Sequence, residues 1–329
     1  MKAIALISGG LDSILAAKVI QGQGVEVIPL HFKIPFCHKV KDSSRQSVLV
    51  KENLGLDLIK VDLEQEFLDV LKNPRYGFGS NMNPCIDCKI LMLSKAKGLM
   101  QELGADFVVT GEVLGQRPMS QHKQALFLIP RRAGLEGLVV RPLCARVLAE
   151  TIPEIKGWVR RDGLLNFNGR RRNPQVDLAK ELQIKDYAWP SGGCLLTDPG
   201  FSRRLKELIE HKELNAREVG LLKFGRHFRL SPNTKLVVGR DEEEDNQLAD
   251  LAQAGDYVFM PPETAGSTAL GRGNFTQSLI KLSCSIIARY CDKPAGANVK
   301  ISYRTAQDKE EKILEVFPLD DVELEKIRI

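Results

Sequence analysis

Six residues near the N-terminus, SGGLDS at positions 8–13, have the composition of a phosphate-binding turn. They follow an apolar run at residues 2–7 that is typical of a buried strand, and a segment of helical composition comes next. Gly9 and Gly10 allow backbone angles at which amide N–H groups face inward, and the dipole of the next helix favours an anion there. The alternative is a helix cap after a glycine turn. The residues expected to bind a nucleotide pyrophosphate are Ser8, Gly9, Gly10 and Ser13.

Asp12 is the unusual member of this turn, because an acid beside phosphates needs a cation between them. Coordination of Mg²⁺ is its expected role. The turn is not GxxxxGK[ST] and has no lysine, so it is not a Walker-type loop. It resembles instead the SGGxDS pattern of PP-loop ATP pyrophosphatases, which implies that ATP activates a substrate oxygen and that pyrophosphate is released.

Cysteines at CxxC spacing occur in NPCIDCK, as Cys85 and Cys88, and Cys194 lies in the glycine-rich stretch SGGCLLTDPG. Two thiolates one turn apart at a helix start are favoured by the helix dipole. Three thiolates are too few for a closed Cys₄ zinc site, but they suit a [4Fe–4S] cluster with one open iron that carries sulfide. Two alternatives stay open: a relay in which one cysteine carries a persulfide and another resolves it, and structural zinc or buried thiols.

The remaining cysteines have settings that predict no chemistry. Cys37–His38 is a lone pair in a loop, for which no role is expected although it could face the site. The cysteines in apolar segments, expected in the core, are Cys144, Cys284 and Cys291.

A second candidate loop, TGEVLGQRPMSQ at Thr110–Gln121, follows a strand-like run. It resembles the TGExLGQxxSQ motif of tRNA 4-thiouridine synthetases, a PP-loop family, and the resemblance covers roughly residues 1–200 with SGGLDS, PCIDCKILML and RPL. It implies that this loop lines the nucleotide and activation site, with Glu112 in a catalytic role. The residues carried over are Gly111, Glu112, Gln116, Ser120 and Gln121. A helix-capping loop is the alternative.

The chain also departs from that family. We expect it to lack the usual N-terminal RNA-binding domains, since the printed sequence has no room for them before Met1, and to lack a C-terminal rhodanese-like domain with a persulfide cysteine. We therefore expect RNA binding and sulfur delivery to be arranged differently, which favours the cluster.

The elements that position these loops alternate regularly. Strand-like runs at residues 25–32, 56–63 and 105–112 are separated by helical segments, the longest at residues 89–104. This order predicts a parallel α/β sheet, and the resemblance implies an adenine nucleotide alpha hydrolase-like, Rossmann-like domain. In open parallel sheets ligands bind at the carboxyl ends of strands, so the two loops should meet. Helices are also expected at residues 150–163 and 174–184.

Short strands dominate beyond residue 225, so we expect a smaller α+β domain at 226–329 after a PP-loop domain at 1–225. The second domain resembles the RNA-binding domain of NFACT proteins in KLVVGRDEEEDNQL, GDYVFMPPETAGS and NVKISYR, which implies RNA binding; a protein-interaction or dimerisation module is the alternative. Its matching positions are Gly239, Arg240, Asn246, Gly266 and Ser267.

The net charge of +5 is compatible with a polyanionic partner. The arginine runs Arg131–Arg132 and Arg170–Arg172 suit phosphate contacts, although a solvated surface is the commoner fate. No run reaches the roughly 18 apolar residues of a membrane span, and nothing reads as a secretory signal, which favours the cytoplasm. The chain is also a candidate homodimer.

Together these features predict ATP-dependent thiolation of a tRNA uridine. The carbonyl oxygen is adenylated with release of pyrophosphate, and sulfur from sulfide or a persulfide carrier then displaces AMP. The alternatives are a PP-loop ligase that acts on a small molecule with a nitrogen nucleophile, and a non-catalytic RNA- or ribosome-binding factor.

Overall fold

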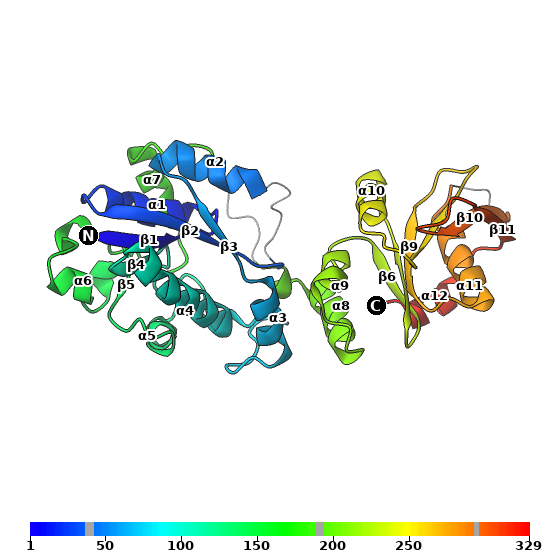
Figure 1. Cartoon of the computed structure of the whole chain (residues 1–329), viewed down its shortest axis with the longest axis horizontal. Coiled ribbons are helices and arrows are strands. Elements are labelled where there is room, and N and C mark those ends of the chain that lie inside the picture. The colour runs from blue at the N-terminus through cyan, green and yellow to red at the C-terminus, as the bar shows by residue number, and fades with distance from the viewer. Residues whose placement is uncertain (37–42, 188–193, 293–295) are drawn as a thin grey trace. The chain divides into compact units, whose positions relative to one another are not determined.

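The computed structural model describes residues 1–36, 43–187, 194–292 and 296–329, which form two compact units, Met1–Asp198 and Pro199–Ile329 (Figure 1). The first unit contains a parallel five-stranded sheet in the order β3-β2-β1-β4-β5. Its strands are β1 Lys2–Leu6, β2 Glu26–Lys33, β3 Ile59–Asp62, β4 Phe107–Thr110 and β5 Val139–Val140.

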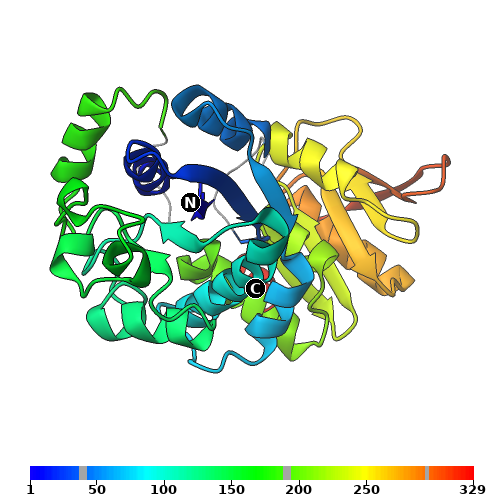
Figure 2. The same ribbon diagram turned by 60° about the vertical axis from the view of Figure 1, so that its left-hand side comes forward.

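Helices cover both faces of this sheet, with α1, α2 and α7 on one side and α3, α4 and α5 on the other (Figure 1). Figure 2 shows the same layers from a second direction, with dark-blue α1 and blue α2 opposite teal α4. Side chains of β1 alternate between the two cores: Ala3 and Ala5 pack with α1, and Ile4 packs with α4 and α5. The helices are α1 Leu11–Gln21, α2 Ser43–Leu54, α3 Glu64–Lys72, α4 Cys85–Leu103, α5 Lys123–Arg132, α6 Ile152–Ile155 and α7 Asn173–Glu181, with 3₁₀ turns η1 Ala145–Val147, η2 Arg161–Gly163 and η3 Leu195–Thr197.

The expected parallel α/β domain is therefore confirmed, and its strand order locates the site. From β1 the chain moves outward to β2 and β3, and it then returns to place β4 on the other side of β1. Leu6, at the end of β1, pairs with Leu30 of β2 and Thr110 of β4. The two loops that follow β1 and β4 thus leave the sheet side by side, at the reversal of strand order where open α/β sheets bind ligands.

Some helices differ from the expectation. The segment 150–163 was expected to be helical, but it forms only the single turn α6 and the 3₁₀ turn η2. The helix stops because Gly157 takes a φ of 70° one residue after the C-cap, outside the helical region. Helices α3 and α5 were not expected; α5 contains Pro130, which weakens the helical signal.

The second unit is an antiparallel six-stranded sheet in the order β11-β10-β8-β9-β7-β6. Its strands are β6 Arg226–Ser231, β7 Thr234–Val238, β8 Tyr257–Met260, β9 Ala269–Gly273, β10 Val299–Thr305 and β11 Lys312–Val316, and its helices are α8 Pro199–Glu210, α9 Ala216–Leu221, α10 Glu242–Asp250, α11 Gln277–Ala288 and α12 Asp321–Ile327. The expected smaller α+β domain is confirmed. Strand β9 escaped the sequence analysis because its glycines read as a turn; Gly271 is required there, since a Cβ would lie 2.4 Å from the Phe275 ring.

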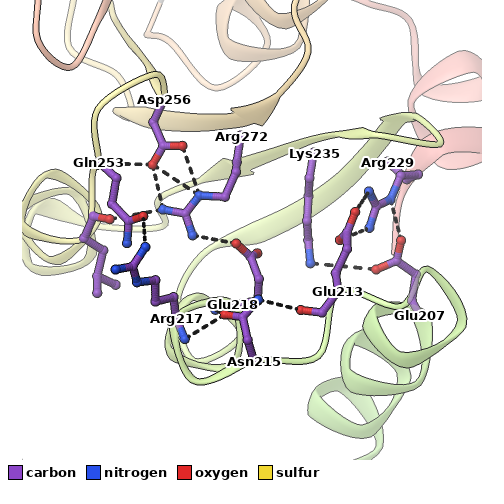
Figure 3. Close-up of polar contacts among 11 residues, drawn as sticks. Glu207, Glu213, Asn215, Arg217, Glu218, Arg229, Lys235, Gln253, Asp256 and Arg272 are labelled. Carbon is purple, nitrogen blue, oxygen red and sulfur yellow. Dashed lines mark hydrogen bonds and ion pairs between the residues drawn. The ribbon is translucent and has the colours of Figure 1, made fainter.

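The division between the units falls at Asp198–Pro199, whereas the sequence placed it near residue 225. Helices α8 and α9, with the loop between them, belong to the second unit because carboxylates of this segment pair with bases of its sheet (Figure 3). Arg229 of β6 contacts Glu207 at 2.5 Å and Glu213 at 2.9 Å, and Arg272 of β9 contacts Glu218 at 2.8 Å. The sequence alone does not show which of its charged residues pair when they are this far apart along the chain.

No helix in the described part of the chain combines the length and apolar character needed to cross a membrane.

Candidate nucleotide-binding and activation site

The turn after β1 is held by its own serines. The hydroxyl of Ser13 donates to the carbonyl oxygen of Gly10 at 2.7 Å and accepts from the backbone N–H of Ser8 at 3.2 Å. Gly9 has a φ of 82°, a conformation that favours glycine, and its Cα faces the buried side chain of Gln46 on α2. The turn therefore leads directly into α1 at Leu11, with the positive end of that helix behind it.

The second loop packs directly on the first. A Cβ on Gly111 would lie 2.4 Å from the carbonyl oxygen of Asp12 and 2.6 Å from the amide nitrogen of Ser13, so only glycine permits this approach. Farther along, the amide of Gly115 donates to the carbonyl of Gln121 at 2.7 Å, which closes the loop on itself. The structure thus brings together the two loops that the sequence analysis placed at one edge of the sheet.

Two further side chains lie against Asp12, and a third reaches it through one of them. Its Oδ2 accepts a hydrogen bond from Nε2 of Gln116 at 2.7 Å and lies 3.9 Å from Nη1 of Arg172. Gln116 in turn accepts from Nε2 of Gln175, at 3.1 Å. The other carboxylate oxygen of Asp12, Oδ1, is buried and has no hydrogen-bond partner within the described residues.

That orphaned oxygen fits a divalent cation. Mg²⁺ is commonly bound by one or two carboxylates together with substrate phosphates, so a single protein oxygen beside a phosphate turn is sufficient. Asp12 is the residue of this chain that would hold it.

Ser120 and Gln121 are buried in the same loop. The hydroxyl oxygen of Ser120 and Oε1 of Gln121 have no hydrogen-bond partner among the residues that the structure describes. Unsatisfied buried polar atoms are costly, so these two atoms are suitable partners for a bound ligand.

Glu112 is buried between two bases rather than open to a ligand. Its Oε1 pairs with Lys89 of α4, and its Oε2 accepts from Arg141 at 2.9 Å and from the Thr110 hydroxyl at 3.1 Å. Burial alone would raise the pKa of Glu112, but the charges and hydrogen bonds of Lys89 and Arg141 hold the pKa at about 2. The carboxylate is therefore ionised, and it ties the second loop to α4 and to the segment after β5.

Several of these residues were not identified as site residues from the sequence. Lys89 follows the CxxC directly and Arg141 begins the RPL segment, so both had a positional signal. Arg172 belongs to an arginine run that suits phosphate contacts, although a solvated surface was the commoner expectation. Its neighbours Arg170 and Arg171 are exposed, as are Arg131 and Arg132. Gln175 had no signal, because a single glutamine on a helix is unremarkable in sequence.

Cys85 and Cys88 lie in the first turn of α4, as the CxxC spacing predicts. Cys85 donates to Oδ1 of Asn83 at 3.0 Å. The segment that carries Cys194 packs against the residues just before this helix: the amide of Met82 donates to Leu196 O at 3.1 Å, and the side chain of Asn81 donates to Thr197 O at 2.8 Å. The chain segments that carry the three cysteines therefore adjoin.

Adjoining segments do not make a metal site. Within residues 1–36, 43–187, 194–292 and 296–329, no three His, Cys, Asp or Glu side chains are placed together so as to hold a metal ion. As they lie here, Cys85, Cys88 and Cys194 are not placed to hold an iron–sulfur cluster. Cys37 and His38 lie outside the described residues.

The cysteines expected in the core are buried there. Burial raises the pKa of the Cys144 thiol to about 11 and that of Cys284 to about 12, which keeps both protonated. Cys291 is also buried, and its Cα lies against Gly266.

In the second unit the GR motif forms a tight turn. Gly239 donates to Thr268 O at 3.0 Å, beside the Gly266–Ser267 turn, and a Cβ on it would clash with the Asp245 carboxylate. Arg240 is paired with Glu244 of α10, with Nε–Oε1 at 2.9 Å. The acidic run therefore neutralises the arginine of this motif.

Two family models match the chain, each over one of its units. Residues 1–153 match the model described as "Thiamine biosynthesis protein (ThiI)", and residues 225–328 match "NFACT protein RNA binding domain". The parallel sheet, its helices and its two loops fit the PP-loop type of α/β domain, in agreement with the first match. The chain is thus similar to the ThiI family in its first unit and to NFACT RNA-binding domains in its second, as the sequence motifs indicated.

Individual relatives agree with these matches. The chain is 32% identical to a probable tRNA sulfurtransferase from Thermococcus kodakarensis over 43% of its length and 36% of the relative, and 31% identical to the tRNA-specific 2-thiouridylase MnmA of Pelobacter propionicus over 34% of its length and 33% of the relative. It therefore spans about a third of the length of these curated relatives. A crystal structure of a 4-thiouridine synthetase–RNA complex with bound ATP is 20% identical, over 66% of this chain and 53% of that one, with a TM-score of 0.37.

Proposed function

We propose that this chain catalyses ATP-dependent thiolation of a tRNA uridine. The observation that carries the proposal is the contact between the two loops: Gly111 lies against the backbone of Asp12 and Ser13, beside a buried Asp12 oxygen that has no partner within the described residues. The tRNA sulfurtransferase and 2-thiouridylase relatives in the comparisons supply the substrate class. The second unit, which matches an RNA-binding domain, is the proposed holder of the tRNA.

In this proposal the turn from Ser8 to Ser13 binds the β- and γ-phosphates of ATP. The uridine carbonyl oxygen attacks the α-phosphorus, and the bond to pyrophosphate breaks. Asp12 would hold Mg²⁺, which supplies charge neutralisation at the phosphates. The helix dipole of α1 and the guanidinium of Arg172 stabilise the charge that develops on the leaving group.

The second half-reaction replaces AMP by sulfur. Because the three cysteines do not form a cluster site as described, we favour the persulfide relay here. A persulfide donor first transfers its outer sulfur to one cysteine and leaves as a thiol. The terminal sulfur of that cysteine persulfide attacks the activated carbon, and AMP leaves with the oxygen. A second cysteine then attacks the remaining S–S bond, which releases thiouridine and leaves a disulfide for an external thiol to reduce.

The contacts of Met82 and Asn81 with the 194–197 segment favour a relay between an α4 cysteine and Cys194. Iron analysis of anaerobically purified protein decides between the two arrangements. About four irons per chain would restore the cluster, whereas protein without iron that forms a trappable persulfide supports the relay. Cys88→Ala and Cys194→Ala with full activity would remove the cysteines from the mechanism.

The direct test incubates purified protein with ATP, Mg²⁺, a sulfide or persulfide source and unmodified tRNA. We expect pyrophosphate and AMP as products, and thiouridine in the nucleosides after digestion of the tRNA. Release of ADP and orthophosphate, or pyrophosphate release that is indifferent to tRNA, would contradict the proposal. A cytoplasmic location and a homodimer stay predictions, which fractionation and light scattering can check.

A further inference from the structure

A buried chain of hydrogen bonds leads from α7 to the phosphate-binding turn. Nε2 of Gln175 donates to Oε1 of Gln116 at 3.1 Å, and Nε2 of Gln116 donates to Oδ2 of Asp12 at 2.7 Å. Gln175 is 1% exposed and Gln116 is 8% exposed, so water has little access to either amide. Three elements, α7, the second loop and α1, are joined by this chain.

The hydrogen bonds from Gln175 through Gln116 to Asp12 can run in only one direction. An ionised carboxylate accepts hydrogen bonds and cannot donate them, so Gln116 must present its NH₂ group to Asp12. The carbonyl oxygen of Gln116 then faces Gln175, which must donate in turn. If either amide turned over, two oxygens would face one another in a buried site, with a cost of about 1–3 kcal/mol for the lost bond.

This direction decides which oxygen of Asp12 is left for a ligand. Nε2 of Gln116 lies 2.7 Å from Oδ2, and Nη1 of Arg172 lies 3.9 Å from the same oxygen. Oδ1 is buried and has no hydrogen-bond partner in the part of the chain that the structure describes. The carboxylate plane is thus fixed with one oxygen bound to protein and the other available.

We propose that Gln175 is a positioning residue, which locks the amide of Gln116 and thereby presents Oδ1 of Asp12 to a divalent cation at the nucleotide phosphates. The inference rests on the proposed function only in its use of a nucleotide and a cation. It assigns a role to α7, an element that carries no recognised motif.

The test is a binding measurement on the whole chain without turnover. Mn²⁺, which shares the preference of Mg²⁺ for oxygen ligands, is titrated by electron paramagnetic resonance in the presence of α,β-methylene-ATP, which cannot be cleaved at the α-position. Nucleotide binding is followed separately by calorimetry. The variants are Gln175→Glu, whose carboxylate cannot donate when it is ionised, and Gln175→Met, which removes the partner without adding charge.

Gln183→Glu is the matched control, because it makes the same change at an exposed residue just beyond α7. Thermal unfolding of every variant checks that the fold is retained.

We expect Gln175→Glu to weaken Mn²⁺ binding by about 10–100-fold, as changes to residues behind a metal ligand generally do, with a smaller loss for Gln175→Met and none for Gln183→Glu. Equal Mn²⁺ affinity in wild type and in a folded Gln175 variant overturns the inference while leaving the proposed function intact. Wild-type protein that binds no nucleotide overturns both. Wild-type protein that binds the nucleotide analogue but takes up no Mn²⁺ overturns the inference and leaves the proposed function intact.

Discussion

At the scale of single residues, Glu112 shows how surroundings set a role. The resemblance of the motif implied a catalytic role, but the side chain is enclosed by Lys89, Arg141 and Thr110. Because the pKa of Glu112 is held at about 2, its carboxylate is ionised and does not donate a proton. Its ion pairs with Lys89 and Arg141 join three segments of the first unit. Its expected contribution is to the shape of the loop that contacts Asp12.

Glu112→Gln should destabilise the first unit by about 3 kcal/mol, because Lys89 and Arg141 would keep their charges in a buried site that has lost its anion. Urea unfolding followed by circular dichroism measures the loss. Glu52→Gln, at an exposed position on α2, is the control and should change stability by less than about 0.5 kcal/mol. Equal stability of the two variants would show that the ion-pair cluster contributes nothing.

The ionisation of Glu112 should also make the stability of the first unit depend on pH. Burial opposes ionisation of Glu112, yet Lys89 and Arg141 hold its folded pKa at about 2, below the value of about 4.3 expected in an unfolded chain. The unfolded state therefore binds the proton more readily, so this stabilisation is present above about pH 4.3 and is lost as the pH falls towards 2. Wild type should lose stability more steeply than Glu112→Gln over this range, in urea titrations at successive pH values. Parallel profiles would contradict the assignment.

At the scale of elements, the site depends on close contact between backbones. The second loop touches the first turn of α1 through Gly111, and α7 reaches the same turn with Arg172 and Gln175. Strand order alone brings the two loops to one edge of the sheet, whereas these contacts fix their spacing. Gly111 and Arg172 are therefore the residues that link these neighbouring elements.

Gly111→Ala should lower nucleotide affinity by at least about 10-fold, because its Cβ would lie 2.4 Å from the backbone oxygen of Asp12 and must push the loops apart. Calorimetry with ATP analogues measures the effect. Gly98→Ala is the control: Gly98 lies inside α4 with nothing within 4 Å of its Cβ position, so this change should stabilise the chain by about 0.5–1 kcal/mol. Unchanged affinity in Gly111→Ala would show that the loops are free to separate.

Arg172→Ala should raise the KM for ATP by about 10-fold, because the phosphate turn has no lysine and Arg172 is the cation 3.9 Å from Asp12. Pyrophosphate release at varied ATP gives KM and kcat separately. Arg171→Ala removes the same charge from an exposed neighbour and should leave the KM for ATP unchanged. The same rise in both variants would indicate a general effect of charge rather than a contact.

At the scale of the whole molecule, two units each bring one part of the proposed chemistry. The first holds the nucleotide loops, and the second matches an RNA-binding domain over 225–328. That match begins after α8 and α9, yet α8 supplies Glu207, α9 supplies Glu218 and the loop between them supplies Glu213 to bases of the sheet (Figure 3). Lys235 of β7 is buried 3.7 Å from Glu207, and burial lowers its pKa.

A fragment of residues 199–329 should therefore fold cooperatively, whereas one of 225–329 should not. The shorter fragment removes Glu207 and Glu213 from Arg229, removes Glu207 from Lys235, and leaves Arg272 with Asp256 alone, which costs several kcal/mol for buried pairs. Thermal melts followed by circular dichroism compare the two fragments. A cooperative melt of the shorter fragment at the same midpoint would show that α8 and α9 are dispensable.

The sequence by itself determined the class of fold and the location of the SGGLDS turn, because strand and helix periodicity and the SGGLDS pattern are local properties of the chain. It also placed the second loop and the CxxC, since each follows or begins a recognisable element. Only the tertiary structure decided that Glu112 is enclosed by Lys89 and Arg141, and that Gln175 reaches Asp12 through Gln116. Those contacts join residues tens of positions apart, and their burial and hydrogen-bond direction arise only when the elements pack together.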